Sequence, residues 1–490
     1  MPASLKALLQ RYSQVFPVGS AGTRFPEILK RRRQRHLEAL NGFAIFSGVP
    51  LEPGAENIWH MNALKIFQEP ALIHLTGINQ PQVTLALVPG DAANKPQEIL
   101  FVPEKNPARE FWDGVRFGYP MVGKGVNSVK AENSRDLSEI RELTGIQDVR
   151  PQGEFDAWFR ALVKRSKQPF GYAFYHHYAD PDKRGKFRTT RTDHNFAFKQ
   201  GLEKIARKVK PGFEIRSCAP LHFHLRLPLE KEQVKDVGIA VEITRQAFAE
   251  TLGSLPTLRD ENALAAHIEH GMRRRSPYGL SFPSIVAGGR NATVLHYLKN
   301  DEALVPGSLV LLDFGARYGT MHADISRTVP VSGRFNPLQA LLYGIVLDAA
   351  KLNERNAKPG AKIRQLNDDV WSFVESALQE RFFAKGGKAE RAYSGKPHGV
   401  SHLMGEQEHD GDPHRLYQDY PLEIGWQISN EPGLYGHFSM SLGGKRYSEW
   451  IGIRIEDDLL ITKSGCRNLS QSIAREVGEI EALIKSGSNR

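Results

Sequence analysis

Residues 398–410, which read HGVSHLMGEQEHD, contain the histidines His398, His402 and His409. The first two are four positions apart, and this spacing places two imidazoles on one face of a helix, as in helical zinc sites. Two glycines interrupt the stretch, and no glutamate directly follows the first histidine. These residue types allow three interpretations: a zinc helix, a set of catalytic bases, or a polar loop that is rich in histidine.

Two aspartates flank a turn-like segment further upstream. Asp313 follows an apolar run and Asp324 lies in an alternating run, with Gly319 between them as a turn former. A hairpin folded about the Tyr318–Gly319 bond would place the two aspartates opposite each other. Like charges in that position destabilise a sheet, so a shared proton or a divalent cation must compensate them. A single aspartate would more often be exposed and cap the turn, but for a facing pair we expect a cation.

Two glutamates near the C-terminus add to this pair. Alternation in WIGIRIEDDLLIT places Arg454 and Glu456 on the polar face of a strand, and Glu431 ends another strand before Pro432. Taken singly, each glutamate is more often a solvated strand position. Together with imidazole, however, four carboxylates suit Mn²⁺, Co²⁺ or Zn²⁺, and they would neutralise two such ions. Two metals can bridge a water and polarise a carbonyl, so the spacing predicts a metal-dependent hydrolase.

The elements that must position these residues change in character along the chain. The N-terminal third mixes helix and strand signals, residues 176–194 read as a polar loop, and long amphipathic helices alternate with strands after about residue 228. This pattern predicts an α+β fold. We expect an N-terminal domain over 1–165, a linker over 166–225 and a catalytic domain over 226–490. The predicted helices cover 24–41, 136–145 (capped by Asp136 and closed by Gly145), 229–255, 260–275, 337–355 and 363–383, and the predicted strands cover 43–48, 82–90, 98–103, 284–289, 308–315, 322–329, 422–435 and 450–462.

The composition of the 490-residue chain excludes several classes of protein. Its formal net charge is +10, but the basic residues are dispersed apart from 30–36 and 182–191, which favours a solvated surface over a nucleic-acid partner. No apolar run is long enough to cross a bilayer, and the N-terminus lacks a secretory signal. The two cysteines, Cys218 and Cys466, form no CxxC pair. We expect a cytoplasmic protein.

The segments NATVLHY, LLDFGARYGTMHADISRT, HGVSHLMG, NEPGLY and IGIRIEDD resemble, in this order, the motifs of the pita-bread metallopeptidases. That family includes methionine aminopeptidase, Xaa-Pro aminopeptidase (aminopeptidase P) and Xaa-Pro dipeptidase (prolidase). PALIHLTGINQPQVTLALVPG and NPAREFWDGVRFG resemble the N-terminal domain of the last two, which methionine aminopeptidases lack. The resemblance implies a C-terminal pita-bread (creatinase/aminopeptidase) domain with a mixed α/β N-terminal domain.

The resemblance also implies a dinuclear metal site, most often with Mn²⁺. Asp313 would chelate one metal, Asp324 and Glu456 would bridge both, and His402 and Glu431 would hold the other. A metal-bridging hydroxide would attack the scissile carbonyl, and Glu431 would accept its proton. Only one imidazole is needed as a ligand, so the helical zinc site is no longer expected.

Four further side chains would face the substrate. His296, His398 and His409 would line the cleft, and one of them would donate a hydrogen bond to the carbonyl oxygen. Arg454 would orient Glu456 or meet a substrate carboxylate. After His402 the family has Gly, Leu or Ile, Asp, Val, His and Asp. Here the corresponding stretch reads GEQEHD, which puts the shape and charge of the proline-side pocket in question.

The predicted activity is that of a Xaa-Pro aminopeptidase, which removes the first residue from peptides with proline second. Prolidase is the near alternative, although Ser401 fits the aminopeptidase pattern better. A non-catalytic binding protein on the same fold, and metal-independent hydrolysis as in the creatinase relatives, rank lower because all five ligands are present. The family usually forms dimers or tetramers, so we expect a homo-oligomer, with no nucleic-acid or membrane partner.

Overall fold

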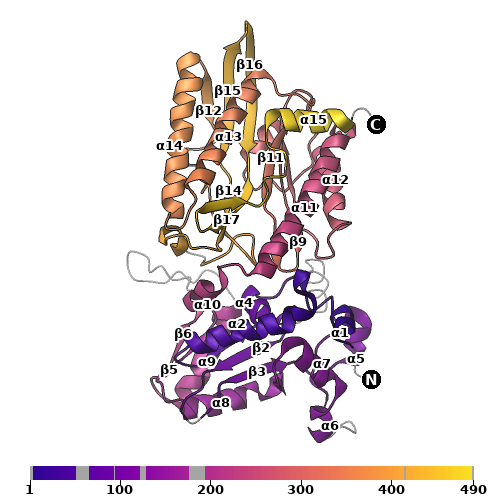
Figure 1. The fold of residues 1–490 in the computed structure, drawn as a ribbon, viewed down its shortest axis with the longest axis vertical. Helices are drawn as coiled ribbons and strands as arrows, with labels where there is room; N and C mark the ends of the chain where they lie inside the picture. Colours follow the sequence, from indigo (N-terminus) through magenta and orange to yellow (C-terminus); the bar gives the residue numbers. More distant parts are fainter. Residues whose placement is uncertain are drawn as a thin grey trace. The chain divides into compact units, whose positions relative to one another are not determined.

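The computed structural model describes residues 4–50, 66–92, 94–121, 128–175, 194–412 and 415–487. The chain divides into two compact units, Met1–Arg226 with Asp412–Arg415, and Leu227–Gly411 with Leu416–Arg490 (Figure 1). No helix in the described ranges combines the length and the apolar character needed to cross a bilayer.

A six-stranded sheet in the order β4-β3-β2-β1-β5-β6 forms the centre of the N-terminal unit. The pairs β1–β2 and β2–β3 are antiparallel, whereas β3–β4, β1–β5 and β5–β6 are parallel. All four residues of β1 are buried, as expected for a central strand that is covered on both faces. The strands are β1 (Ala44–Ser47), β2 (Thr84–Val88), β3 (Gln97–Val102), β4 (Asp148–Pro151), β5 (Phe170–Ala173) and β6 (Glu214–Ser217).

Helices pack on this sheet through their apolar faces. On one face, Phe159 and Leu162 of α8 and Leu202 of α9 join Phe43 and Ile45 in a buried cluster. Helices α2 and α4 contact β2. The helical segments of this unit are α1 (Leu5–Arg11), η1 (Gly19–Arg24), α2 (Phe25–Ala39), α4 (Pro70–Thr76), α5 (Pro107–Asp113), α6 (Ser128–Glu132), α7 (Arg135–Thr144), η2 (Gln152–Glu154), α8 (Phe155–Arg165), α9 (His194–Val209) and α10 (Ala219–Arg226).

The structure corrects two predictions in this unit. Residues 166–225 are not a linker, because β5 and β6 pair into the central sheet and α9 packs against it, so the N-terminal unit extends to Arg226. Short strands with little alternation hide this role from the sequence. Residues 176–193 of the expected polar loop lie outside the described residues. In α7 the N-cap is Ser134, which accepts a hydrogen bond from the Leu137 amide, rather than Asp136, and Gly145 ends the helix as expected.

The C-terminal unit contains several small sheets and four long helices. Its sheets have the orders β11-β8-β7, β12-β15-β16 and β13-β14-β17-β18, and β9 and β10 form a two-stranded hairpin. The strands are β7 (Ile285–Gly288), β8 (Leu309–Phe314), β9 (Arg317–Tyr318), β10 (Met321–His322), β11 (Ile325–Pro330), β12 (Lys388–Arg391), β13 (Leu403–Met404), β14 (Gln427–Asn430), β15 (Gly433–Leu442), β16 (Lys445–Arg454), β17 (Asp457–Thr462) and β18 (Gly465–Asn468).

The four long helices agree with the helical periodicity of the sequence to within a few residues, and they bury their apolar faces in one core with the strands. Capping boxes begin two of them, formed by Glu230 with Gln233 at the start of α11 and by Asn336 with Gln339 at the start of α13. The helical segments are α11 (Lys231–Ser254), η3 (Leu255–Thr257), α12 (Glu261–Arg273), η4 (Gly289–Thr293), α13 (Pro337–Asn356), α14 (Ile363–Arg381), η5 (Phe383–Lys385), η6 (Leu416–Asp419) and α15 (Val477–Gly487).

The register of the hairpin β8–β11 differs from the prediction. Asp313 pairs with Ser326, and Tyr318 pairs with Met321, so the two-residue turn is Gly319–Thr320. Gly319 has a φ of 59°, which favours glycine. Asp313 therefore does not face Asp324 directly. Moving the turn by one residue shifts the pairing by two, and because side chains alternate with a period of two, both aspartates keep their face.

Candidate metal centre

Five side chains that the sequence singles out converge from separate elements of the C-terminal unit. Asp313 lies on β8, Asp324 between β10 and β11, His402 before β13, Glu431 after β14 and Glu456 between β16 and β17. One ligand atom each from Asp313, Asp324 and Glu456 lies within 4.8 Å of the others, and the same holds for His402, Glu431 and Glu456. The two groups share Glu456. The arrangement thus offers two adjoining sets of oxygen and nitrogen donors.

Breaks in the strands turn the donors inward. The single strand predicted over 450–462 is two strands, β16 and β17, which are separated at Ile455 and Glu456. The Glu456 amide donates to the Ser326 carbonyl at 3.0 Å, so this break is tied to β11. Glu431 likewise follows the last residue of β14, and its amide donates to the Val400 carbonyl at 2.8 Å. Both carboxylates therefore leave their strands at ends that backbone hydrogen bonds fix.

Arg454 joins two of the carboxylates, in a way that differs from the prediction. Its Nη2 donates to Asp313 Oδ2 at 2.6 Å, and its Nε donates to Ser326 Oγ at 2.8 Å. Ser326 Oγ in turn donates to Glu456 Oε2 at 2.8 Å. Arg454 therefore orients Asp313 directly and Glu456 only through the serine hydroxyl. It is 4% exposed, with its guanidinium committed to these partners.

The tautomer of His402 follows from its neighbours. His402 Nδ1 lies 3.1 Å from the Leu403 carbonyl, so this nitrogen carries the proton and donates it. Nε2 then carries the lone pair of the ring. It lies 3.5 Å from Glu431 Oε1, 3.8 Å from Asp324 Oδ2 and 4.0 Å from Glu456 Oε1. A lone pair that faces carboxylate oxygens at such distances suits a cation between them.

The charge balance of the cluster also fits divalent cations. Burial and the charges of Glu456 and Asp313 raise the pKa of Asp324 well above its ordinary value. Burial and Asp313 likewise raise the pKa of Glu456. Asp313 Oδ1 is buried and accepts no hydrogen bond from the described residues. Arg454 supplies only one positive charge to these carboxylates. The residues present therefore suit divalent cations, which would bring further positive charge.

His398 lies beside the cluster but has both ring nitrogens engaged. Nδ1 is 2.9 Å from the Gly399 carbonyl, and Nε2 is 2.9 Å from the hydroxyl of the buried Tyr435. Trp371 Nε1 donates to the His398 carbonyl at 3.0 Å. Burial, with the nearby charges of Arg454 and His296, lowers the pKa of His398 to about 4. The imidazole is therefore neutral near pH 7 and firmly held, and neither His398 nor His402 lies on a helix.

The two other predicted cleft histidines, His409 and His296, are exposed. The ring of His409 stacks on that of His402, with centroids 4.1 Å apart and an angle of 9° between the planes. His409 also forms a donor group with Asp324 and His402. His296 follows η4 and is close enough for its charge to act on His398. All nine predicted site residues thus belong to one region of the C-terminal unit.

The loop that carries His296 depends on residues that the sequence did not indicate. The buried Glu261, the first residue of α12, accepts hydrogen bonds from the Gly288 amide at 2.7 Å and the Tyr297 hydroxyl at 2.8 Å. A Cβ at Gly452 on β16 would collide with the carbonyl of Ala292 in η4. Tyr435 and Ser326 were missed in the same way, because they reach the site only through strand pairing.

Ser401, which the sequence favoured as an aminopeptidase feature, is buried and structural in its contacts. Its hydroxyl accepts a hydrogen bond from Asn353 Nδ2 at 3.0 Å, and the same amide group donates to Asn430 Oδ1 at 3.0 Å. The Ser401 amide donates to Asn367 Oδ1. These bonds join the His402 segment to α13, α14 and β14, and so they fix the position of the imidazole.

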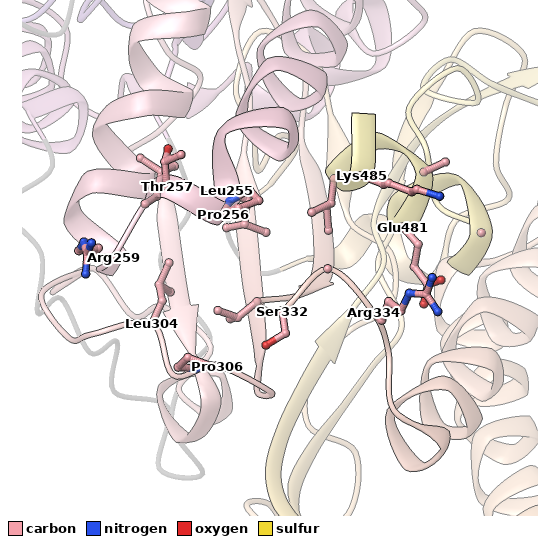
Figure 2. A pocket seen from close by; sticks show the side chains of 16 residues that line it. Leu255, Pro256, Thr257, Arg259, Leu304, Pro306, Ser332, Arg334, Glu481 and Lys485 are labelled. Carbon is pink, nitrogen blue, oxygen red and sulfur yellow. The ribbon is translucent and has the colours of Figure 1, made fainter. Parts of the chain in front are cut away.

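A hollow of about 1190 Å³ elsewhere in the C-terminal unit contains none of these residues. Figure 2 shows its walls, which come from η3, the segment around Pro306, the turn after β11 and α15. Apolar side chains such as Leu255 and Leu304 alternate there with Arg259, Arg334 and Lys485. It offers no group of metal ligands, so the convergent carboxylates remain the chemical centre of the described structure.

Comparisons with known proteins agree with this geometry. The model of metallopeptidase family M24 matches residues 235–463, and that of the aminopeptidase P N-terminal domain matches residues 29–142. The chain is 29% identical to Xaa-Pro aminopeptidase 3 of Rattus norvegicus over 85% of this chain and 76% of that protein. It is 28% identical to Xaa-Pro aminopeptidase of Haemophilus influenzae over 85% of this chain and 88% of that protein.

Solved structures show the same fold. Aminopeptidase P of E. coli with the inhibitor Pro-Leu has a TM-score of 0.72 and 25% identity, covering 95% of this chain and 99% of that one. Aminopeptidase PepP of Pseudomonas aeruginosa has a TM-score of 0.72 and 24% identity over the same shares. The predicted α+β class with the pita-bread domain is therefore confirmed. With its ordered carboxylates and histidine and its two matched domains, the chain is a metallopeptidase whose residues 235–463 are those of family M24.

Proposed function

We propose that this metallopeptidase is a Xaa-Pro aminopeptidase, which releases the first residue of peptides that have proline second. The observation that carries the proposal is the complete set of five donors in a chain that also has the aminopeptidase P N-terminal domain. The curated relatives named above are Xaa-Pro aminopeptidases, and the matches cover most of their length. A bond before proline has no N–H, so the enzyme must recognise the ring by shape rather than the amide by hydrogen bonding.

The metal site is proposed to hold two divalent cations, with Mn²⁺ as the first candidate and Co²⁺ or Zn²⁺ as alternatives. Asp313, Asp324, His402, Glu431 and Glu456 would hold them. Bound cations would lower the pKa of a water and polarise the scissile carbonyl. The chain's own part is to fix the donors: Arg454 holds the Asp313 carboxylate, and the Leu403 carbonyl holds the His402 ring.

Glu431 is proposed as the proton acceptor. Its side chain is 16% exposed, against 3% for that of Glu456, so water and substrate can reach it. Its Oε1 faces His402 at 3.5 Å, and its Oε2 faces His398 Nδ1 at 3.7 Å. A carboxylate held between two imidazoles can receive a proton and pass it to a leaving amine.

The three histidines that are not proposed as metal ligands would have different roles. Both nitrogens of His398 are engaged within the protein, so His398 serves to position its neighbours. His409 and His296 are exposed and near the donor cluster, and they are the proposed hydrogen-bond donors to the carbonyl oxygen. Arg454 is committed to Asp313, so its contribution is orientation rather than contact with a substrate carboxylate.

A peptide panel tests the activity. The full-length protein, dialysed and reloaded with Mn²⁺, is assayed on Xaa-Pro-Xaa tripeptides, Xaa-Pro dipeptides and a tripeptide with alanine second. Turnover of the first set with little cleavage of the last supports the proposal. Cleavage restricted to dipeptides would identify a prolidase instead. The variant Asp324→Asn should lose activity and metal, while Asp419→Asn, at the exposed pair with Arg364, should retain both.

Metal analysis separates this proposal from a binding role on the same fold. A protein that is purified without metal and stays inert with every divalent ion would support the binding role. We also propose a homo-oligomer, a dimer or a tetramer, which light scattering checks. A cytoplasmic location is proposed because both cysteines are free, Cys218 in the core and Cys466 partly buried. Cell fractionation tests it.

A further inference from the structure

The loop from Leu403 to Asp410 holds two acidic side chains in different environments. The Asp410 amide donates to the Leu403 carbonyl at 2.9 Å, and the Gly405 amide donates to the Gln407 carbonyl at 3.0 Å. The Asp410 carboxylate accepts the Glu406 amide at 3.1 Å and the Gly411 amide at 2.7 Å. These bonds close the loop into a rigid turn that fixes where its side chains stand.

Glu406 is a structural residue of this turn. Its side chain is buried, and Oε1 accepts a hydrogen bond from Gln233 Nε2 of α11 at 3.0 Å. Its carbonyl lies 3.3 Å from His322 Nε2. Glu406 therefore anchors the loop to α11 and to the β9–β10 hairpin, and it does not offer a free charge to a substrate.

Glu408 differs on each of these points. It is partly exposed, and no hydrogen bond or ion pair from the described residues engages its carboxylate. It precedes His409, whose ring stacks on His402 of the metal centre. The charges of Arg317 and Asp313 act on its carboxylate, so Glu408 lies near the carboxylates of the metal centre. Burial, opposed by Arg317 and assisted by Asp313, raises the pKa of Glu408 to about 7.

The positive charge of Arg317 acts on this carboxylate, but no salt bridge in the described residues joins the two side chains. Arg317, on β9, directs Nη2 to His322 Nε2 at 3.1 Å. Desolvation lowers the pKa of Arg317 to about 10, although the charge of Glu408 acts in the opposite direction. A half-buried carboxylate without a hydrogen-bond donor is costly, and a cation that arrives with the substrate removes the cost.

We propose that Glu408 is a specificity-determining residue, which receives a cationic group at the amino end of the peptide. The inference rests on the proposed aminopeptidase function. The cation has two sources, the α-ammonium that every such substrate carries, or the side chain of a lysine or arginine in first position. Either group would meet Glu408 as a charge-assisted hydrogen bond, which is worth about tenfold in binding.

Two variants and two readouts test this. Glu408→Gln keeps the shape and removes the charge, and Glu423→Gln, at an exposed position before β14, is the matched control. The first readout is kcat/KM for Arg-Pro-Pro and norleucine-Pro-Pro on the Mn²⁺-loaded enzyme. The second is calorimetric binding of arginine amide and norleucine amide, which requires no proline and no turnover. Equal thermal unfolding midpoints establish that each variant is folded.

The outcomes separate the two sources and the two proposals. A loss of about tenfold for arginine ligands alone assigns Glu408 to a basic first side chain. An equal loss for both ligands assigns it to the α-ammonium. Binding and turnover that match the wild type for both ligands overturn the inference. If no Xaa-Pro peptide is cleaved, the proposed function fails, yet the amide binding still decides whether Glu408 receives a cation.

Discussion

Replacing Arg454 by methionine removes the one positive charge that the described structure pairs with the carboxylate cluster. Arg454 is buried, and its bonds to Asp313 at 2.6 Å and to Ser326 at 2.8 Å have good hydrogen-bond lengths. The substitution keeps the apolar stem and leaves Asp313 as a buried carboxylate without its partner. Breaking a buried pair in this way costs about 3–5 kcal/mol of unfolding free energy. We expect that loss in the metal-free protein.

Added Mn²⁺ should reduce the loss, because bound cations replace the missing positive charge. The matched control is Arg364→Met, at a pair in which both side chains are more than half exposed. Removing that exposed pair should cost less than about 1 kcal/mol with or without metal. Arg454→Lys keeps the positive charge but not the paired hydrogen bonds of the guanidinium to Asp313 and Ser326. Its free energy of unfolding should therefore lie between those of the wild type and Arg454→Met.

The assay is urea unfolding of the full chain with and without Mn²⁺, followed by pulsed hydrogen exchange. Peptides that span β8 and β16 report the C-terminal unit alone, so unfolding of the N-terminal unit does not confuse the result. If Arg454→Met lowers the free energy of unfolding no more than Arg364→Met does, the Arg454–Asp313 pair does not stabilise the folded protein. An equal cost with and without Mn²⁺ would show that no metal binds the carboxylates that Arg454 holds.

Three further results are expected. Burial lowers the pKa of His36 to about 4, so below pH 6.5 the unfolded chain binds more protons than the folded one. The free energy of unfolding of the N-terminal unit, measured by urea titration, should therefore fall by about 3 kcal/mol between pH 6.5 and 4. In His36→Gln this free energy should depend less on pH. Glu431→Gln should lower kcat roughly 100-fold while metal analysis finds the ions retained. Gly452→Ala should displace the carbonyl of Ala292, cost about 1–3 kcal/mol, and raise KM through the His296 loop.

Each of these has an outcome that would contradict it. An unchanged pH slope in His36→Gln would mean that other groups set the acid sensitivity. Full activity in Glu431→Gln would remove it from the list of proton acceptors. A normal KM in Gly452→Ala, with unfolding at the wild-type urea concentration, would separate η4 from substrate binding.

Local periodicity was enough to predict the long helices and the faces of the key strands. Asp313 lies on the expected face of β8, and Glu431 stands at a strand end beside Pro432. The hairpin prediction placed the turn one residue too early, yet it brought Asp313 and Asp324 to the same face. Side chains alternate along a strand, so an error of two positions in pairing leaves the chemistry in place.

The sequence alone determined which acids and imidazoles are available, because residue type and a period of two or 3.6 are properties of neighbouring positions. Only the tertiary structure decided how they are partnered. Arg454 meets Asp313, 141 positions away, and His398 rather than His402 meets Tyr435. Likewise β5 and β6 join a sheet that begins at residue 44. Such contacts depend on which strands pair and where loops close, and these are set by packing across the whole unit.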